Sequence, residues 1–290
     1  MLLHNDHDTH LGRIRICAYV VVGLCALILI VKLETMQQLS EYESSPIDWC
    51  ETNYEVHEDI AEFWNSFSSI PIALVAPLGY MQNIVPPHVW VEFSDVKLIF
   101  VLIVLIGAGS TYFHSTLSVF GQIMDEMSII WLTLYSALLV IPPNQYRLLV
   151  ASAFMRSVFV AFICATTMLG LLLPVVSHIF VLACAPFGLY NHVQAFRKSK
   201  NVVAKAKFRL ALKFFTAAWA CWLTDRFFCS KIQWLRAEYG VALQLHACWH
   251  ILIAIVAYIL IGVCLAFREE VHAPFRAARS PNSRSHVSIV

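Results

Sequence analysis

"HACWHILIAIVAYILIGVCLAF", residues 246–267, contains no aspartate, glutamate, lysine or arginine. As a helix, an apolar run of about 20 residues crosses the roughly 30 Å hydrocarbon core of a bilayer. The whole chain shares this character, since 59% of its residues are hydrophobic, 13% are charged and the mean hydropathy is +0.68. An average soluble domain carries about a quarter charged residues. The sequence therefore predicts an all-α, polytopic membrane protein.

Apolar runs of spanning length recur along the chain, and each is expected to form a transmembrane helix. The first, at residues 16–33, follows a short basic flank, but no small-residue cleavage site comes after it. We therefore interpret this run as a signal anchor rather than a removable signal peptide. The remaining predicted spans are 60–82, 96–114, 125–141, 148–172, 174–195, 210–229 and 246–267.

These runs divide the chain into three expected regions. Residues 1–40 form a cytoplasmic amino terminus with the extra hydrophobic anchor helix, and residues 41–267 form a bundle of seven transmembrane helices. Residues 268–290 form a basic, disordered cytoplasmic tail.

Basic residues in the loops predict the orientation, because lysine and arginine favour the cytoplasmic side. The segment 196–209, "FRKSKNVVAKAKFR", is the most basic loop, and counting spans backwards from it puts Arg13 and Arg15 inside as well. Arg156 falls within a predicted span, where it should face the bundle interior or mark a shifted helix end. The segments expected on the lumenal or extracellular side are 34–59, 115–124 and 230–245.

The charges and cysteines narrow the function further. The net charge is +1 and no basic cluster is interleaved with aromatic residues, so nucleic acid is not an expected partner. Most of the nine cysteines lie in apolar runs, where a thiol behaves as a small hydrophobe. Cys50 and Cys229 fall on the predicted oxidising side, where a disulfide can persist. We favour a bridge between them over two unpaired thiols, although sequence alone gives no distance.

A set of polar residues is expected at one depth of the membrane. Ser110 and His114 are four residues apart at the end of one predicted span, and His246 and His250 have the same spacing at the start of the last. The topology places these ends on the non-cytoplasmic side, together with Asp125, which opens the next span. Three imidazoles and a water form a typical catalytic zinc site. Asp125 could deprotonate that water and Ser110 could bind the reacting oxygen.

The structural alternative is that each histidine is a hydrogen-bonded interface residue. Glu126 is expected to face elsewhere on its helix and so to be a poorer base than its neighbour Asp125. His178 and His192 have no comparable company in the sequence and are expected to be packing or interface residues.

The acidic stretch "WCETNYEVHEDIAEFWNS", residues 49–66, precedes and opens the second predicted span. Hard oxygen ligands of this kind suit Ca²⁺. A solvated acidic linker is the alternative, but Glu62 lies at the start of the span and would be partly buried without a cation. The spacing is not that of an EF-hand. The candidate calcium ligands are Asp48, Trp49 through its carbonyl, Glu51, Asn53 and Glu62.

"DWCETNYEVHEDIAEFWNS", "STYFHS" and "HACWHI" together resemble the alkaline ceramidase family, over roughly residues 46–267. These are seven-helix intramembrane zinc amidases related to the progestin and adipoQ receptors. The resemblance implies hydrolysis of ceramide to sphingosine and a free fatty acid, an outward amino terminus, and a disulfide between Cys50 and Cys229. The extra run at 16–33 departs from the family pattern. The implied site residues are His114, His246 and His250 for zinc; Asp125 and Ser110 for catalysis; and Asp48, Trp49, Glu51, Asn53 and Glu62 for calcium.

The expected function is therefore that of a hydrolase acting on a linear amide bond, with Zn²⁺ and Ca²⁺ as cofactors. Ceramide and membrane lipid are the expected partners, without an obligate protein partner. A heptahelical lipid-sensing receptor or pseudoenzyme with a structural zinc is the main alternative, and a transporter is the third. The expected location is the endoplasmic reticulum or Golgi membrane, with the metal sites toward the lumen and the carboxyl terminus in the cytoplasm.

Overall fold

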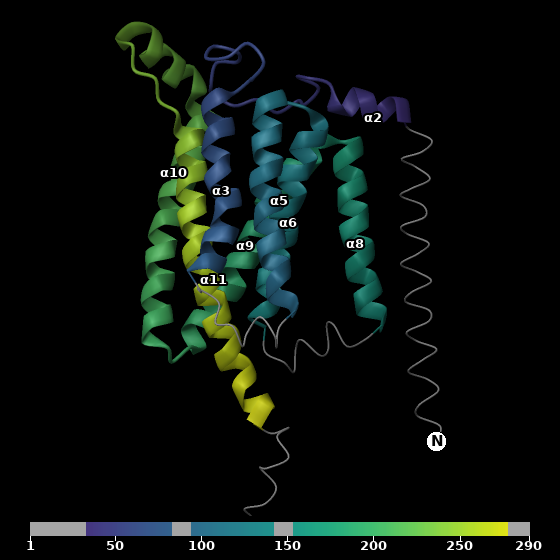
Figure 1. Cartoon of the computed structure of the whole chain (residues 1–290), viewed down its shortest axis with the longest axis vertical. Helices are drawn as coiled ribbons and strands as arrows, with labels where there is room; N and C mark the ends of the chain where they lie inside the picture. The colour runs from purple at the N-terminus through teal and green to yellow at the C-terminus, as the bar shows by residue number, and fades with distance from the viewer. Residues whose placement is uncertain (1–32, 83–93, 142–152, 278–290) are drawn as a thin grey trace, which may run out of the picture.

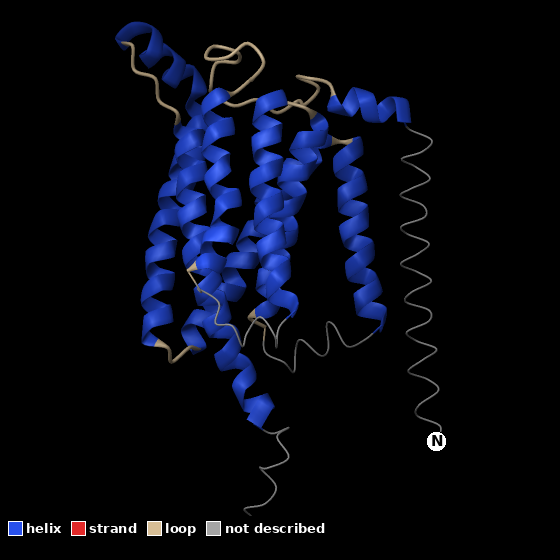
Figure 2. Ribbon diagram, in the orientation of Figure 1, coloured by secondary structure: helices blue, strands red, loops and turns tan. Residues whose placement is uncertain are grey.

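A computed structural model describes residues 33–82, 94–141 and 153–277 of the chain. The first predicted span, apart from its last residue, and the last part of the predicted tail lie outside these ranges. Every regular element in the described part is a helix, and the only β feature there is an isolated bridge between His57 and Ile60 (Figure 2). The helices are α2 (Leu33–Ser40), α3 (Phe63–Met81), α5 (Ser94–Thr116), α6 (Val119–Leu139), α8 (Ala153–Leu172), α9 (Pro174–Lys198), α10 (Val202–Tyr239) and α11 (Leu245–Ala277).

The long helices run side by side as a bundle, while the short α2 lies across one end of it (Figure 1). The acidic loop between α2 and α3 is at that same end. Backbone hydrogen bonds fix this arrangement, since Ala61 N and Glu62 N donate to the carbonyls of Ser115 and His114 at the end of α5. The expectation of an all-helical fold is confirmed for the described residues. The start of α3, the end of α5 and the start of α11 meet at the end of the bundle where the acidic loop lies.

Three stretches of the described helices are long and apolar enough to cross a membrane, namely Leu98–Thr116, Pro174–Lys198 and Leu245–Val271. Large hydrophobic side chains are also exposed on the outer faces of the bundle, among them Leu74 and Ile179. Aqueous surroundings would make such exposure costly, whereas lipid would not. These features support membrane association, and the numbers of seven bundle helices and eight spans stay predictions.

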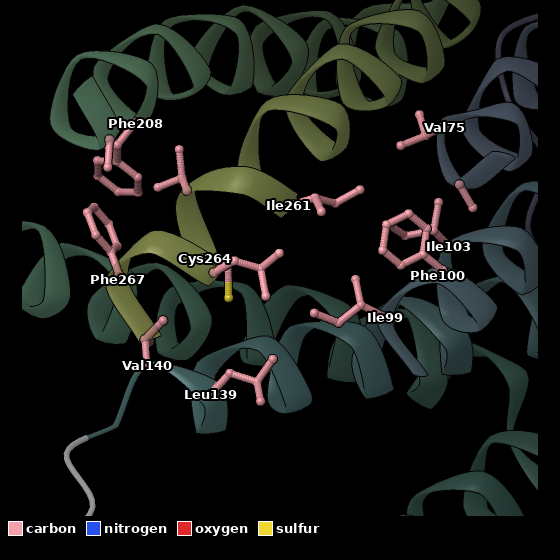
Figure 3. Packing of buried hydrophobic residues seen from close by; sticks show 14 of the residues in the cluster. Val75, Ile99, Phe100, Ile103, Leu139, Val140, Phe208, Ile261, Cys264 and Phe267 are labelled. Carbon is pink, nitrogen blue, oxygen red and sulfur yellow. The ribbon is translucent and has the colours of Figure 1, made fainter. Parts of the chain in front are cut away.

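The main core lies in the half of the bundle away from the acidic loop. It is built around α11, where Val263 and Phe267 are fully buried and Ile261 and Cys264 pack beside them (Figure 3). Phe208 of α10 contacts Phe267 with ring centroids 5.9 Å apart. This packing holds α11 between α3, α6 and α10.

Three helices differ from their predicted spans. Helix α11 runs to Ala277, so residues 268–277 of the predicted disordered tail are helical. Helix α6 begins at Val119, where the Ser118 hydroxyl caps it by accepting a hydrogen bond from Gly121 N at 3.1 Å, so Asp125 lies in its second turn and does not open the helix. Helix α10 continues to Tyr239 across a kink at Phe228, so most of the predicted outer loop 230–245 is helical. The mean hydropathy of the sequence falls where a helix would leave the membrane, but the helix itself can continue into water.

The other correction concerns the basic segment 196–209. Most of it is helical, because α9 ends at Lys198 and α10 begins at Val202. Arg156 lies in the first turn of α8, and its side chain is outside the described part of the structure.

Glycines allow α5 to approach both of its neighbours. A Cβ atom on Gly107 would lie 2.2 Å from Ala73 N of α3, and one on Gly109 would lie 2.9 Å from Asp125 N of α6. Both distances are shorter than any real Cβ contact, so these positions accept only hydrogen. The close approach brings Ser110 next to Asp125.

We expect Gly107→Ala to destabilise the bundle, because its methyl group would collide with backbone that cannot move alone. Overpacking of this kind costs about 1–3 kcal/mol. The midpoint of thermal unfolding in detergent should fall clearly for this variant. Gly170→Ala is the matched control, since a Cβ there would meet only side-chain atoms, at 3.1 Å. Equal midpoints for the two variants would contradict the close packing of α3 on α5.

Candidate metal centre

Three histidines from two helices converge at the end of the bundle near the acidic loop. His114 is in the last turn of α5, and His246 and His250 are in the first two turns of α11. One ligand atom from each lies within 4.8 Å of the others, and all three side chains are buried. No other group of three histidine, cysteine, aspartate or glutamate residues comes this close in the described ranges.

Each imidazole is held from its outer side. The Nδ1 atom of His114 lies 2.5 Å from a carboxylate oxygen of Glu62, and Nδ1 of His250 lies 2.8 Å from the Ser68 hydroxyl. The ring of His246 stacks on Trp49, with centroids 3.6 Å apart and planes 18° from parallel. The hydrogen bonds orient His114 and His250 and fix the tautomer that leaves their inner nitrogen free, whereas His246 is oriented by stacking alone and its Nδ1 has no partner in the protein. Three buried, mutually adjacent imidazoles therefore fit a tetrahedral ion with one open position.

Ser110 and Asp125 lie beside the histidines. The Ser110 hydroxyl accepts a hydrogen bond from Ser69 at 3.0 Å and is itself hydrogen-bonded to Asp125. The Oδ1 atom of Asp125 is buried without a protein partner. Both residues line the same cavity as the three histidines. The structure thus brings together all five residues proposed for zinc and catalysis, while their roles stay predictions.

The acidic loop covers this centre through Glu62. One carboxylate oxygen of Glu62 accepts a hydrogen bond from Trp49 N at 2.9 Å, and the other accepts one from the Asn65 amide at 2.9 Å and contacts His114. The Asn53 amide donates to Asp48 at 3.4 Å, and Asn53 Oδ1 is buried without a donor. A carboxylate pair with an unsatisfied amide oxygen beside it has the chemistry of a cation site.

Burial has electrostatic consequences for the loop carboxylates. Burial, together with the neighbouring Glu62, raises the pKa of Asp48 to about 6. Burial likewise raises the pKa of Glu51 to about 7. The Glu51 carboxylate caps α3, because it accepts hydrogen bonds from Trp64 N at 2.6 Å and Asn65 N at 2.8 Å. The Glu51 side chain thus caps the start of α3 and is also one of the clustered carboxylates.

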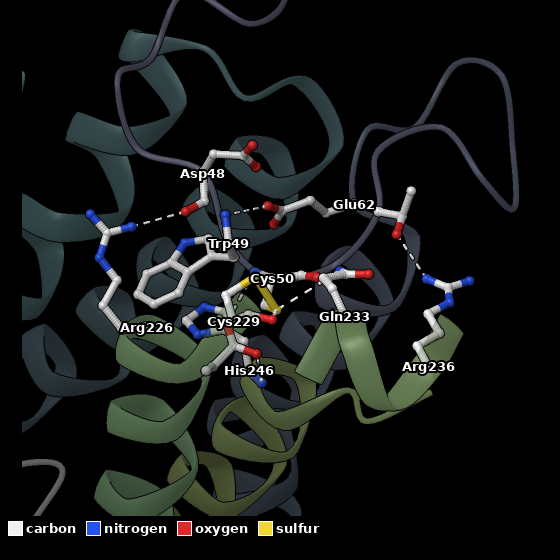
Figure 4. The surroundings of a disulfide bond; sticks show 11 residues. Asp48, Trp49, Cys50, Glu62, Arg226, Cys229, Gln233, Arg236 and His246 are labelled. Atoms are coloured by element: carbon white, nitrogen blue, oxygen red, sulfur yellow. Dashed lines mark hydrogen bonds between the residues drawn. A yellow bond between two sulfur atoms is a disulfide. The ribbon is translucent and has the colours of Figure 1, made fainter. Parts of the chain in front are cut away.

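The loop is fastened to α10 by covalent and polar contacts (Figure 4). A disulfide joins Cys50 to Cys229, with Cα atoms 5.2 Å apart. The Arg226 guanidinium donates to the Asp48 carbonyl at 3.0 Å, and the Arg236 guanidinium donates to the Thr52 hydroxyl at 2.8 Å. The part of α10 beyond the Phe228 kink is therefore bonded to one side of the acidic loop.

Residues 41–279 of the chain match the model of the ceramidase family. This chain belongs to the ceramidase family. Alkaline ceramidase 1 of Homo sapiens is 33% identical over 223 residues, which cover 76% of this chain and 81% of that protein. Alkaline ceramidase of Drosophila melanogaster is 31% identical over 239 residues, covering 80% and 81%, and alkaline ceramidase of Arabidopsis thaliana is 28% identical over 219 residues, covering 74% and 80%. The resemblance inferred from the motifs is confirmed.

Two residues of this ceramidase-family site were missed by the sequence analysis. Asp225 of α10 accepts hydrogen bonds from Cys50 N at 3.1 Å and His246 N at 3.3 Å, so it ties the loop to the start of α11. His178 of α9 lines the cavity and contacts Glu126, Trp49 and Trp222. The sequence analysis interpreted His178 as a packing or interface residue, and the structure adds a polar contact with Glu126 in the cavity. Glu126 does face away from Asp125, toward α9.

If the three histidines bind a metal ion, loss of one imidazole should prevent that binding. We expect His246→Ala, purified in detergent, to lose most of its zinc, while the unchanged protein holds about one ion per chain. Elemental analysis measures this without any assay of activity. His192→Ala is the matched control, because His192 is also buried in the cavity but its Nδ1 bonds to the Gly188 carbonyl of its own helix at 2.8 Å. Retention of full zinc by His246→Ala would exclude the three-histidine site.

Proposed function

We propose that this chain is a zinc-dependent amide hydrolase that cleaves ceramide to sphingosine and a free fatty acid within the membrane. The observation that carries the proposal is the buried set of three histidines with Asp125 and Ser110 beside it at one end of an apolar cavity. Membership of the ceramidase family and relatives named alkaline ceramidases support the substrate class.

The cavity has the mostly apolar lining that suits lipid chains. It has a volume of about 300 Å³ and extends from the histidines toward the opposite end of the bundle. Its walls are mostly aliphatic and aromatic, with contributions from Ile103, Leu132, Phe208 and Leu260. An apolar pocket with a few polar groups at one end binds a lipid with its polar part oriented. The acyl and sphingoid chains would lie along these walls with the amide at the histidines.

The three histidines would hold zinc, which in such a site activates a water molecule and polarises a carbonyl group. The Oδ1 atom of Asp125 is available in the cavity to take the proton from the attacking water and later to return it to the leaving amine. The Ser110 hydroxyl accepts a hydrogen bond from Ser69 and donates its proton to Asp125. Once Asp125 has taken the proton of the water, it no longer needs that hydrogen bond, and Ser110 can turn its proton to the reacting oxygen. The surrounding apolar walls exclude other water, which strengthens these polar contacts.

The acidic loop is proposed to bind Ca²⁺ through Asp48, the Trp49 carbonyl, Glu51, Asn53 and Glu62. A cation would neutralise the clustered carboxylates and satisfy the buried Asn53 oxygen. Because Glu62 also contacts His114, the cation would stabilise the orientation of a zinc ligand. This coupling gives the loop a role in catalysis without contact with the substrate.

The proposed location is the endoplasmic reticulum or Golgi membrane, with the acidic loop in the lumen and the tail in the cytoplasm. The basic segment at the opposite end of the bundle and the Cys50–Cys229 disulfide both support this orientation. A lipid-sensing receptor with a structural zinc would need the same histidines. The placement of Asp125 and Ser110 in the cavity favours the enzyme.

Turnover of ceramide in mixed micelles tests the activity directly. The purified protein should release sphingosine and fatty acid, and a zinc chelator should stop the release. Asp125→Asn should lower kcat by about 10²- to 10⁴-fold, which is the usual contribution of a general base. Glu238→Gln, at an exposed carboxylate near the end of α10, is the control and should be fully active. A receptor would bind ceramide and cleave none of it.

Two loop variants should separate calcium binding from zinc binding. Asn53→Ala should weaken calcium binding and leave zinc content unchanged, because Asn53 contacts Asp48 and no histidine. Glu62→Ala should weaken both, since loss of an outer-sphere partner typically lowers metal affinity by about 10- to 100-fold. Calcium titration and elemental analysis of the same samples measure the two effects. If neither variant alters calcium binding, the loop is an acidic linker.

A further inference from the structure

A second polar cluster in the cavity is not used by the proposed hydrolysis. The Glu126 carboxylate of α6 accepts hydrogen bonds from the Gln122 amide at 3.0 Å and from the Ser177 hydroxyl. Its other oxygen lies 2.8 Å from Nδ1 of His178. Both oxygens of Glu126 are thus engaged by neighbouring side chains, so it is a poorer general base than Asp125, one of whose oxygens has no partner. The evident effect of Glu126 is to hold His178.

The His178 ring is also fixed by stacking. It lies on Trp222 with centroids 5.6 Å apart and planes 20° from parallel, and 6.0 Å from the Trp49 ring. Trp49 stacks in turn on His246, so His178 lies one aromatic ring away from the three-histidine set. A histidine held by a carboxylate on one edge and by an indole on one face is oriented as binding residues require.

The second ring nitrogen of His178 has no partner in the protein. Its Nε2 atom is buried, and the residue lines the cavity. An ionised carboxylate can only accept, so Nδ1 carries the proton toward Glu126, and in the neutral tautomer Nε2 presents a lone pair to the cavity. A buried acceptor without a donor is costly, and a ligand that supplies a hydroxyl would remove this cost.

We propose that Nε2 of His178 accepts a hydrogen bond from a hydroxyl group of the sphingoid base, and that Glu126 is the positioning residue for this contact. The inference rests on the proposed ceramide hydrolysis and names the group that the cavity selects. Ceramide carries its two hydroxyls on the carbons that flank the carbon bearing the amide nitrogen. An amide at the histidines therefore brings both hydroxyls within a few bonds of it, where the apolar walls offer few other acceptors.

This contact would make the site selective for hydroxylated amides over simple fatty amides. A site built to bond a substrate hydroxyl discriminates against the analogue that lacks it, because the buried polar group is then left unpaired. The aliphatic walls bind chains of either kind alike, so discrimination must come from a polar residue.

The test compares binding of three lipids to protein with and without the His178 nitrogen. The lipids are a ceramide and two analogues that lack the hydroxyl on C1 or on C3. Binding to Asp125→Asn is measured by quenching of tryptophan fluorescence, so that turnover is not required. Ceramide should bind about 10- to 100-fold more tightly than one of the two analogues, as the loss of one buried hydrogen bond predicts. In Asp125→Asn/His178→Phe, which keeps the aromatic ring, that preference should disappear.

Further variants separate binding from structure. Glu126→Gln should reduce the preference and leave zinc content unchanged, and His178→Gln, which retains an acceptor, should restore part of it. His192→Phe, at the other cavity histidine, should alter the binding of all three lipids alike. If His178→Phe weakens all three lipids equally, or leaves the preference intact, the inference is wrong. Absence of turnover by the unchanged protein would reject the hydrolase proposal alone, because the binding comparison stands without it.

Discussion

The buried carboxylate of Glu62 connects the two halves of the candidate site. Its side chain is fully buried, and it bonds at once to Trp49 N, to the Asn65 amide and to Nδ1 of His114. A carboxylate in such a place is stable only if every lone pair has a donor or a cation. The acidic loop, the start of α3 and the end of α5 must therefore meet in one arrangement. The position of the three histidines depends on how these segments pack together.

Around this carboxylate, the acidic loop is held against the end of the bundle by several contacts. Asp225 holds both the Cys50 and the His246 backbone, Glu51 caps α3, and the kinked extension of α10 contacts the loop through Arg236. Each fastening satisfies a polar group that lies at the edge of an apolar bundle. The same contacts thus supply hydrogen-bond partners to the buried polar groups and fix the geometry of the site. They explain how a loop rich in charge can pack against the end of an apolar bundle.

Helical spacing and topology sufficed to predict much of the site. Four-residue spacings put His246 beside His250 and Ser110 beside His114, and the depth argument placed both pairs at one end of the bundle. The same argument, applied further, would have found His178 at the outer start of α9 and Asp225 near the outer part of α10. What no spacing could predict is the partner of each, since His178 meets Glu126 across 52 positions and Asp225 meets Cys50 across 175.

The helix ends were the least predictable part of the fold. The hydropathy of α10 falls after Cys229, yet the helix continues to Tyr239 because Gln233 and Arg236 find partners on the loop. Conversely, α6 begins before its apolar run, where Ser118 supplies a cap. In α6 the Ser118 cap decides where the helix starts, and in α10 Gly240, at a φ of 67°, ends a helix that has continued past its apolar run. A window of mean hydropathy detects neither.

The disulfide has a consequence for how the chain is assembled. Its two cysteines are 179 positions apart, with the loop near the beginning of the bundle and α10 close to its end. During synthesis the loop is made early, but its covalent anchor and two of the three histidines arrive only with the last two helices. The three-histidine set can therefore form only once nearly the whole bundle has been made. Partly made chains would lack it altogether.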